Sequence, residues 1–369
     1  MPPQPPDPPA SRAFDETDIQ LLDALHANPR ASFERLGPAL DISAVTAARR
    51  WQRLVESGRA WVSSVPGPQL ALAGASLEIR AQPGRALEVA RALAMVPQVM
   101  SVYATDGAFD LQALVITDTV ASLSRLLLEH LTGIPEIATA QSQVCLEWYS
   151  GTRWRLGAID TTQQHSVTDG SGNRPPSVGK QLAFRNRTLT PEDRALFLAL
   201  QHDGRARYRD LATQLGMTEQ QVRRRLDTLV RHGVLGFRTD FTRSEGGWPT
   251  EYALRISVPH HALAEVGTEI GRWPQTRICT ATTGPANLLV MAQVHHTSDL
   301  TGLFDRIRSG TPVAQVLDHR LVLRAVKSWG RLLDENGHSS GIVPVDPWAS
   351  WHSATAPQPD RRSSAPARS

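Results

Sequence analysis

Two stretches of this chain share one pattern of residues, and that pattern decides the fold. Residues 189–233 read LTPEDRALFLALQHDGRARYRDLATQLGMTEQQVRRRLDTLVRHG, and residues 14–58 read FDETDIQLLDALHANPRASFERLGPALDISAVTAARRWQRLVESG. The two stretches align without a gap at an offset of 175 positions, which places Asp18 on Asp193. A match of this length indicates an internal duplication.

Each copy predicts three short helices. In the second copy, Thr190 can cap a first helix because its hydroxyl accepts from a free backbone N–H, and this helix ends near His202. A second helix, at 208–215, ends at Gly216, whose missing Cβ suits a tight turn. Thr218 caps a third helix. Its apolar stripe is formed by Val222, Leu226 and Leu229. This succession is typical of a helix-turn-helix.

The polar face of each third helix supplies candidate DNA contacts, because glutamine can pair with adenine and arginine with guanine or phosphate. In the second copy the candidates are Thr218, Gln220, Gln221, Arg223, Arg224 and Arg231. In the first copy they are Ser43, Val45, Thr46, Arg49, Arg50 and Arg53. The first set holds fewer base-reading groups, so we expect the second copy to contribute more specificity. The alternative is that these are ordinary solvated arginines of an arginine-rich chain.

After each helix-turn-helix, the pattern runs strand, helix, strand, strand, helix, strand. In the first half the predicted strands are 77–81, 99–105, 111–116 and 137–148, and the helices are 85–95 and 120–131. In the second half the strands are 252–258, 277–282, 288–294 and 313–326, and the helices are 261–272 and 299–307. The predicted fold class is α+β, with two winged helix-turn-helix domains and two ferredoxin-like βαββαβ sensor domains.

Low apolar content marks the segments between and beyond these units. The stretches 1–13 and 161–181 and the tail from residue 338 are predicted to be disordered. The predicted segments are a disordered N-terminus at 1–13, helix-turn-helix domain 1 at 14–65, sensor domain 1 at 66–157, a linker at 158–186, helix-turn-helix domain 2 at 187–245, sensor domain 2 at 246–336 and a disordered tail at 337–369.

Composition allows a nucleic-acid partner without requiring one. The net charge is +3, and the pI is about 9.2. No apolar run reaches the ~18 residues of a membrane span, and the N-terminus lacks a signal-peptide pattern, so we expect a cytoplasmic, nucleoid-associated protein with no membrane partner. Cys145 and Cys279 are expected to be buried thiols rather than a bridge or metal pair.

The quoted motifs resemble the Lrp/AsnC (feast/famine) transcription regulators, and each half resembles one member. The resemblance implies double-stranded DNA as partner and sensor domains that pair across their sheets, giving an intramolecular pseudo-dimer or a homo-oligomer. It also implies an amino acid or other small-molecule effector near a Gly-x-x-Asp turn. The corresponding residues are Gly107, Asp110, Gly284 and Asn287. Asn287 cannot supply the anion that Asp110 offers, and all four also suit hairpin turns.

An enzyme is the alternative, because tandem chains of this kind also resemble sirohaem decarboxylases. That group carries a His-Asn-Tyr stretch on the second sensor strand, where this chain has 101–104 and 277–280, and both histidines are absent. There is no P-loop, dinucleotide fingerprint, G-x-S-x-G or H-E-x-x-H motif. His295-His296 lacks partners at metal-ligand spacing. We therefore expect no catalytic residues, metal site or cofactor.

Overall fold

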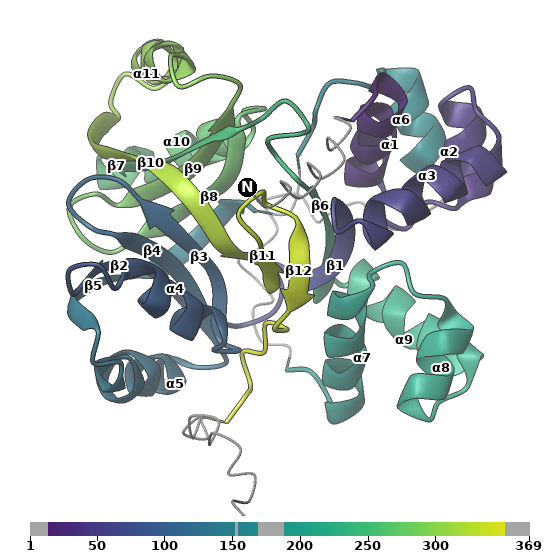
Figure 1. Ribbon diagram of the computed structural model, residues 1–369, viewed down its shortest axis with the longest axis horizontal. Helices are drawn as coiled ribbons and strands as arrows, with labels where there is room; N and C mark the ends of the chain where they lie inside the picture. The colour runs from purple at the N-terminus through teal and green to yellow at the C-terminus, as the bar shows by residue number, and fades with distance from the viewer. Residues whose placement is uncertain (1–13, 152–153, 169–187, 351–369) are drawn as a thin grey trace, which may run out of the picture.

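The computed structural model describes residues 14–151, 154–168 and 188–350. Two helical heads lie on one side of the molecule and a large curved sheet lies on the other (Figure 1). Within the described residues, no helix is long and apolar enough to cross a membrane.

Each head is a three-helix unit at the predicted position. Head 1 consists of α1 (Glu16–Ala27), α2 (Phe33–Ala39) and α3 (Ala44–Glu56). Head 2 consists of α7 (Pro191–His202), α8 (Tyr208–Leu215) and α9 (Glu219–Arg231). Thr190 caps α7 and Gly216 ends α8 with a φ of 65°, as the sequence predicts. The three-helix prediction is therefore confirmed in both copies.

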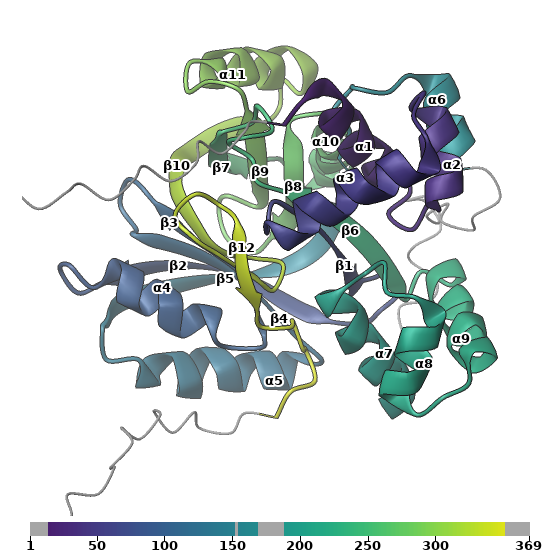
Figure 2. The same cartoon turned by 45° about the vertical axis from the view of Figure 1, so that its right-hand side comes forward.

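Two hinge strands connect the heads to the sheet. They are β1 (Ala60–Pro66) and β6 (Leu235–Phe241), which pair antiparallel with each other and form a separate two-stranded sheet. Figure 2 shows them where the two heads meet the large sheet. One hydrophobic core runs through both heads and the hinge strands, including Leu54, Val62, Leu229 and Phe237. The heads therefore share a core instead of folding independently.

The sensor halves have the predicted βαββαβ order. The first half contains β2 (Ala73–Ala81), α4 (Ala86–Ala94), β3 (Val99–Thr105), β4 (Leu111–Thr117), α5 (Val120–Arg125), which continues as η1 (Leu126–His130) and η2 (Leu131–Gly133), and β5 (Ile137–Ser150). The second contains β7 (Thr250–Ser257), η4 (His260–Ala262), α10 (Leu263–Gly271), β8 (Thr276–Thr282), β9 (Leu288–Val294), α11 (Asp299–Gly310) and β10 (Gln315–Ser328). Helices α4 and α5 lie on one outer side of the sheet, and α10 and α11 on the other (Figures 1 and 2).

The two sensor halves close into one barrel. Strand β5 pairs with β2 of its own half and β8 of the other, and β10 pairs with β7 of its own half and β3 of the other. Side chains from both halves, such as Met100, Leu114, Ile278 and Leu289, form a core between them. The halves are thus joined by backbone pairing at two seams and by a common interior.

The predicted disorder is wrong for two segments. Residues 161–168 form helix α6 (Thr161–Thr168), which packs on head 1 and buries Val167. Asp23 holds the preceding chain by accepting from the backbone N–H groups of residues 156, 158 and 159. Beyond residue 337, β12 (Ser339–Ile342) pairs with β11 (Arg331–Leu333). The predictions for 1–13, 169–187 and 351–369 lie outside the described residues.

Candidate nucleic-acid interface

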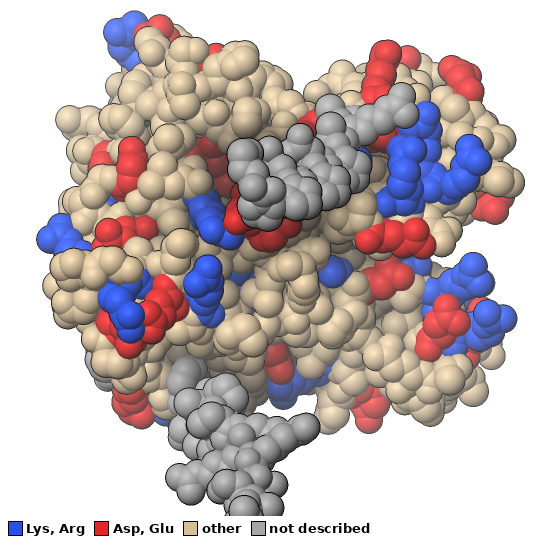
Figure 3. Space-filling model, in the orientation of Figure 1, with Lys and Arg blue, Asp and Glu red and all other residues tan. Residues whose placement is uncertain are grey.

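The outer face of α9 is open to solvent, as the sequence predicts. Val222, Leu226 and Leu229 are buried against the rest of head 2. The exposed side chains on the other face are those of Gln220, Gln221, Arg223, Arg224, Asp227 and Arg231. On the face of the molecule drawn in Figure 3, arginine side chains lie on both heads, interspersed with acidic ones.

Thr218 and Gln221 secure the start of α9 and do not project freely. The backbone N–H of Gln221 donates to Thr218 Oγ1 at 3.2 Å, and the backbone N–H of Thr218 donates to Gln221 Oε1 at 2.8 Å. This reciprocal pair is a capping box. In head 1 Ser43 caps α3 by accepting from the backbone N–H of Thr46 at 3.0 Å. Of the predicted contacts on α9, the side chains of Gln220, Arg224 and Arg231 are exposed, and the exposed Arg223 guanidinium lies 5.9 Å from the ring centre of Tyr208.

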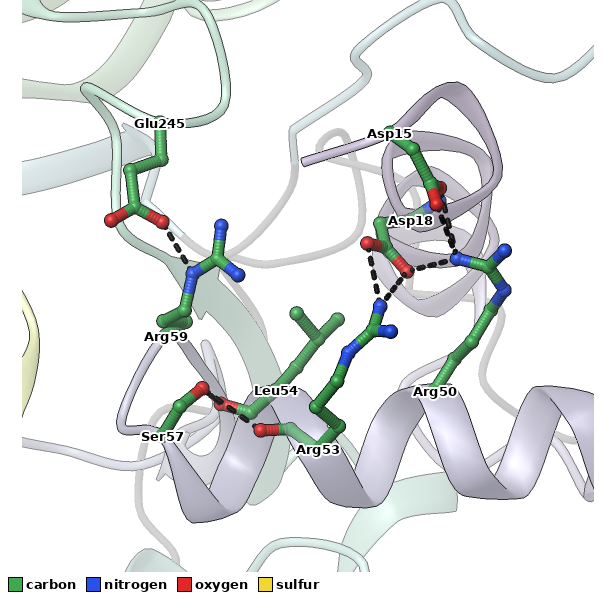
Figure 4. A network of polar contacts seen from close by, with 8 residues as sticks. All are labelled: Asp15, Asp18, Arg50, Arg53, Leu54, Ser57, Arg59 and Glu245. Atoms are coloured by element: carbon green, nitrogen blue, oxygen red, sulfur yellow. Dashed lines mark hydrogen bonds and ion pairs between the residues drawn. The ribbon is translucent and has the colours of Figure 1, made fainter. Parts of the chain in front are cut away.

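In head 1, two of the predicted contacts are held inside the domain. Arg50 lies 2.7 Å from Asp15 and 2.8 Å from Asp18, and Arg53 lies 2.9 Å from Asp18 (Figure 4). Hydrogen bonding to Asp15 raises the pKa of Arg50 above its ordinary value. These ion pairs attach α3 to α1, so Arg50 and Arg53 act within the head in this structure. Their role as DNA contacts stays a prediction.

The same ion pair recurs in head 2 and was missed by the sequence reasoning. Arg225 lies 2.9 Å from Asp193, and these residues stand 175 positions after Arg50 and Asp18. The repeated Arg–Asp pair was visible at the fixed offset of the duplication. Arg225 and Asp193 join α9 to α7 as Arg50 and Asp18 join α3 to α1.

Two arginines clamp the heads together across the duplication. Arg205 donates through Nη1 to the Pro29 carbonyl and through Nη2 to the Ala31 carbonyl, both at 2.7 Å. Its counterpart Arg30 donates to the carbonyls of Gly204 and Ala206. The contacts are reciprocal, as expected for a pseudo-two-fold arrangement.

Aromatic rings reinforce this clamp. The Arg205 guanidinium lies 4.8 Å from the ring centre of Phe33, and the Arg30 guanidinium lies 5.3 Å from that of Tyr208. Burial lowers the pKa of Arg205 to about 10, so it stays charged at neutral pH. The clamp, the paired hinge strands and the shared core fix the two candidate recognition helices relative to each other.

Residues 329–349, called here the C-terminal strap, tie both heads to the sheet. Gln201 of α7 exchanges two hydrogen bonds of 2.7 Å with the backbone of Val345. The backbone N–H of Ser339 donates to the Gly58 carbonyl, directly after α3, at 2.7 Å. The strap is present in the second copy alone among the described residues, so the repeat did not predict it.

The four predicted effector residues form two equivalent turns. Gly107 and Gly284 have φ values of 84° and 99°, which favour glycine. Asp110 Oδ2 accepts from the backbone N–H of Ala81 at 2.8 Å. Asn287 accepts from the backbone N–H of Val258 at 2.9 Å and donates to its carbonyl at 2.8 Å. These side chains hold turns, and their effector role stays a prediction.

A buried charge cluster under head 1 was not predicted. Asp240 on β6 accepts from Arg238 at 2.7 Å and from Arg277 at 3.2 Å, and it also contacts Arg243. Burial opposes its ionisation, but the three guanidiniums outweigh burial and hold the pKa of Asp240 well below its usual range. Arg277 also lies 4.2 Å from the ring centre of Trp154. The cluster joins a hinge strand to the barrel.

Comparison with known proteins gives the same domains. Residues 14–55 and 189–230 each match the AsnC-type helix-turn-helix domain, and residues 74–154 match the Lrp/AsnC ligand binding domain. An uncharacterized HTH-type transcriptional regulator of Pyrococcus abyssi is 25% identical over 146 residues, which are 37% of this chain and 87% of that protein. The HTH-type transcriptional regulator Ptr1 of Methanocaldococcus jannaschii is 28% identical over 121 residues, which are 32% of this chain and 82% of that protein.

A solved structure shares the fold of nearly the whole chain. The siroheme decarboxylase NirDL superposes with a TM-score of 0.52 at 15% identity, covering 84% of this chain and 92% of that chain. The structure of its complex with an iron-uroporphyrin III analogue superposes with a TM-score of 0.53 at 16% identity, covering 85% of this chain and 93% of that chain. This likeness concerns the fold alone. Fold and domain matches together define a tandem helix-turn-helix protein with paired ferredoxin-like domains. The chain thus carries the AsnC-type helix-turn-helix domain twice and the Lrp/AsnC ligand binding domain once.

Proposed function

We propose that the chain is a sequence-specific, DNA-binding transcription regulator of the Lrp/AsnC type that presents two reading heads from one polypeptide, at the nucleoid in the cytoplasm. The observation that carries the proposal is the exposed Gln220 and Arg224 face on a capped α9. Both side chains project from a helix that packing and capping hold firmly. Amide and guanidinium groups held in this way can read base edges in the major groove.

The two heads differ in what they can read. On α3 the predicted contact Val45 is 77% exposed, and Arg49 is also exposed, one helical turn further along. A valine can touch a thymine methyl group but cannot hydrogen-bond to a base. Because the heads are clamped and unlike, the operator should have two different half-sites at one fixed spacing.

Binding is tested with the full chain and a labelled duplex carrying the promoter of its own or a neighbouring gene. The affinity should fall steeply as salt rises, because phosphate contacts release counterions. Gln220→Ala and Arg224→Ala should each weaken binding by about 1–3 kcal/mol, roughly 5- to 150-fold. Arg308→Ala is the matched control, since this exposed arginine lies on α11, away from the heads. Salt-independent binding, or equal losses in the control, would contradict the proposal.

A small-molecule effector, foremost an amino acid, is proposed from the ligand binding domain match at 74–154. DNA affinity would be measured with and without each amino acid. Asp110→Asn is the sharpest variant, because it copies Asn287 and can keep the turn while removing the charge. An effector that shifts wild-type affinity but not the variant would support the role of Asp110.

A second candidate is a sirohaem decarboxylase-like tetrapyrrole enzyme, favoured by the whole-chain fold match. Neither residues 101–104 nor residues 277–280, where that group carries its His-Asn-Tyr stretch, include a histidine. Tyr103 in the first stretch is buried, and burial raises its pKa to about 12, so it is a poor acid or base at neutral pH. Mixing with sirohaem tests this candidate: a Soret band that titrates to one equivalent would favour it.

A further inference from the structure

Four polar side chains meet inside the barrel, one from each of four strands. They are Glu78 on β2, Gln143 on β5, Arg255 on β7 and Arg320 on β10. Glu78, Arg255 and Arg320 are only 4%, 6% and 5% exposed. Charges this deeply buried need partners, because water no longer stabilises them.

Strand register shows that Glu78 and Arg255 occupy the same position in the two halves. Glu78 lies opposite Gln112 on β4, and Arg255 lies opposite Leu289 on β9. Arg255 stands 177 positions after Glu78, and Leu289 stands 177 positions after Gln112. The two equivalent residues face each other across the halves, with Arg255 Nη1 3.8 Å from Glu78 Oε2.

Gln143 and Arg320 are the second equivalent pair at the same offset. Arg320 Nη1 lies 2.5 Å from Glu78 Oε1, and Arg255 Nη1 donates to Gln143 Oε1 at 2.7 Å. Gln143 Nε2 donates to Glu78 Oε2 at 3.2 Å. The first half thus contributes a carboxylate and an amide, and the second contributes two guanidiniums.

We infer that this interface accepts only unlike halves. Two first halves would bury Glu78 against its own copy without a buried cation, and two second halves would gather four guanidiniums without a buried carboxylate. Each arrangement leaves buried charges unpaired, which is strongly destabilising. The partner that fits each half is therefore the other half of this chain type, and not a second copy of itself. This inference does not rest on the proposed DNA binding.

A second place in the fold shows the same divergence. Asp240 of the buried cluster stands 175 positions after Val65, the offset of the heads and hinge strands. Arg277 stands 177 positions after Met100, the offset of the sensor halves. Val65 and Met100 are buried in the core between the sensor halves. Here too, equivalent residues of the two halves have become chemically different.

The test compares two variants of the full chain. The like-set variant combines Arg255→Glu with Arg320→Gln, so that the second half carries the residues of the first. The exchanged variant adds Glu78→Arg and Gln143→Arg, which restores the unlike set with its sides reversed. The like-set variant should melt on the order of 10 °C below wild type, and the exchanged variant should recover most of this loss.

The two variants share the same substitutions in the second half, which makes the exchanged variant the matched control. Asp318, which lies 2.5 Å from Arg320, is 43% exposed on its side chain and contributes little in either variant. If the melting temperatures of both variants lie equally far below that of the wild type, or if both equal it, the interface does not select unlike halves and the inference is wrong.

Discussion

Removal of the Arg205 side chain is the most direct test of the clamp between the heads. In Arg205→Ala, head 1 loses two hydrogen bonds of 2.7 Å to its Pro29 and Ala31 carbonyls. It also loses a cation–π contact of 4.8 Å on Phe33. The variant chain should still fold, because the shared core and hinge strands remain.

The size of the loss follows from these contacts. A hydrogen bond from a charged donor contributes about 1.5–3 kcal/mol, and the cation–π contact adds about 0.5–1 kcal/mol. Part of this is offset because the buried guanidinium no longer has to be desolvated. We therefore expect the free energy of unfolding to fall by about 3 kcal/mol and the melting temperature by about 5–10 °C.

Thermal unfolding followed by circular dichroism measures this change. Arg209→Ala is the matched control, because that side chain is 72% exposed and its nearest carboxylate, Asp210, is 3.7 Å away. The control should stay within about 0.5 kcal/mol of wild type. If Arg205→Ala has the same melting temperature as the control, the clamp does not hold the heads together and the argument for a fixed half-site spacing is refuted.

Three further variants test other parts of the structure. Burial lowers the pKa of Lys327 to about 7. Between pH 7 and 10 this lysine is protonated in the unfolded chain but neutral in the folded one, so the free energy of unfolding of the wild type should rise with pH. Lys327→Met should therefore be more stable than the wild type at pH 7. The difference in free energy of unfolding between the two should shrink by about 1.4 kcal/mol per pH unit in denaturant titrations. A pH-independent gap would contradict this. Arg225→Ala breaks the 2.9 Å pair with Asp193 and should lower the melting temperature of the chain while leaving its ranking of operator sequences unchanged. Gly204→Ala places a Cβ 2.5 Å from Val62 Cγ1 and should destabilise the chain by about 1–3 kcal/mol in denaturant titrations, whereas an unchanged midpoint would show that the heads can separate freely.

The heads and the sensor order were predictable because local signals specify them. Thr190, Thr218 and Gly216 mark helix ends, and the offset of 175 positions repeats the pattern in both copies. The exposed face of α9 follows from its apolar stripe alone. Capping and stripe are properties of adjacent residues, so a sequence shows them directly.

Contacts between distant segments were not predictable in the same way. Helix α6 has a polar sequence with one buried anchor, Val167, whose carbonyl accepts from Asn28 Nδ2 at 2.7 Å. Its order depends on head 1 and not on its own composition. Closure of the barrel and the meeting of Glu78 with Arg255 likewise depend on strand pairing between the halves. Arg50 was assigned to the DNA-facing set because the pattern of α3 alone does not show its ion pair with Asp18, which only the comparison of the two copies reveals.

Selection of duplexes from a random pool by the full chain tests the central claim most directly. We predict enrichment of one sequence with two unlike half-sites at a fixed spacing, and a loss of binding when either half-site is replaced by a copy of the other. Enrichment of no sequence, or equal affinity for the palindromic replacements, would contradict the account.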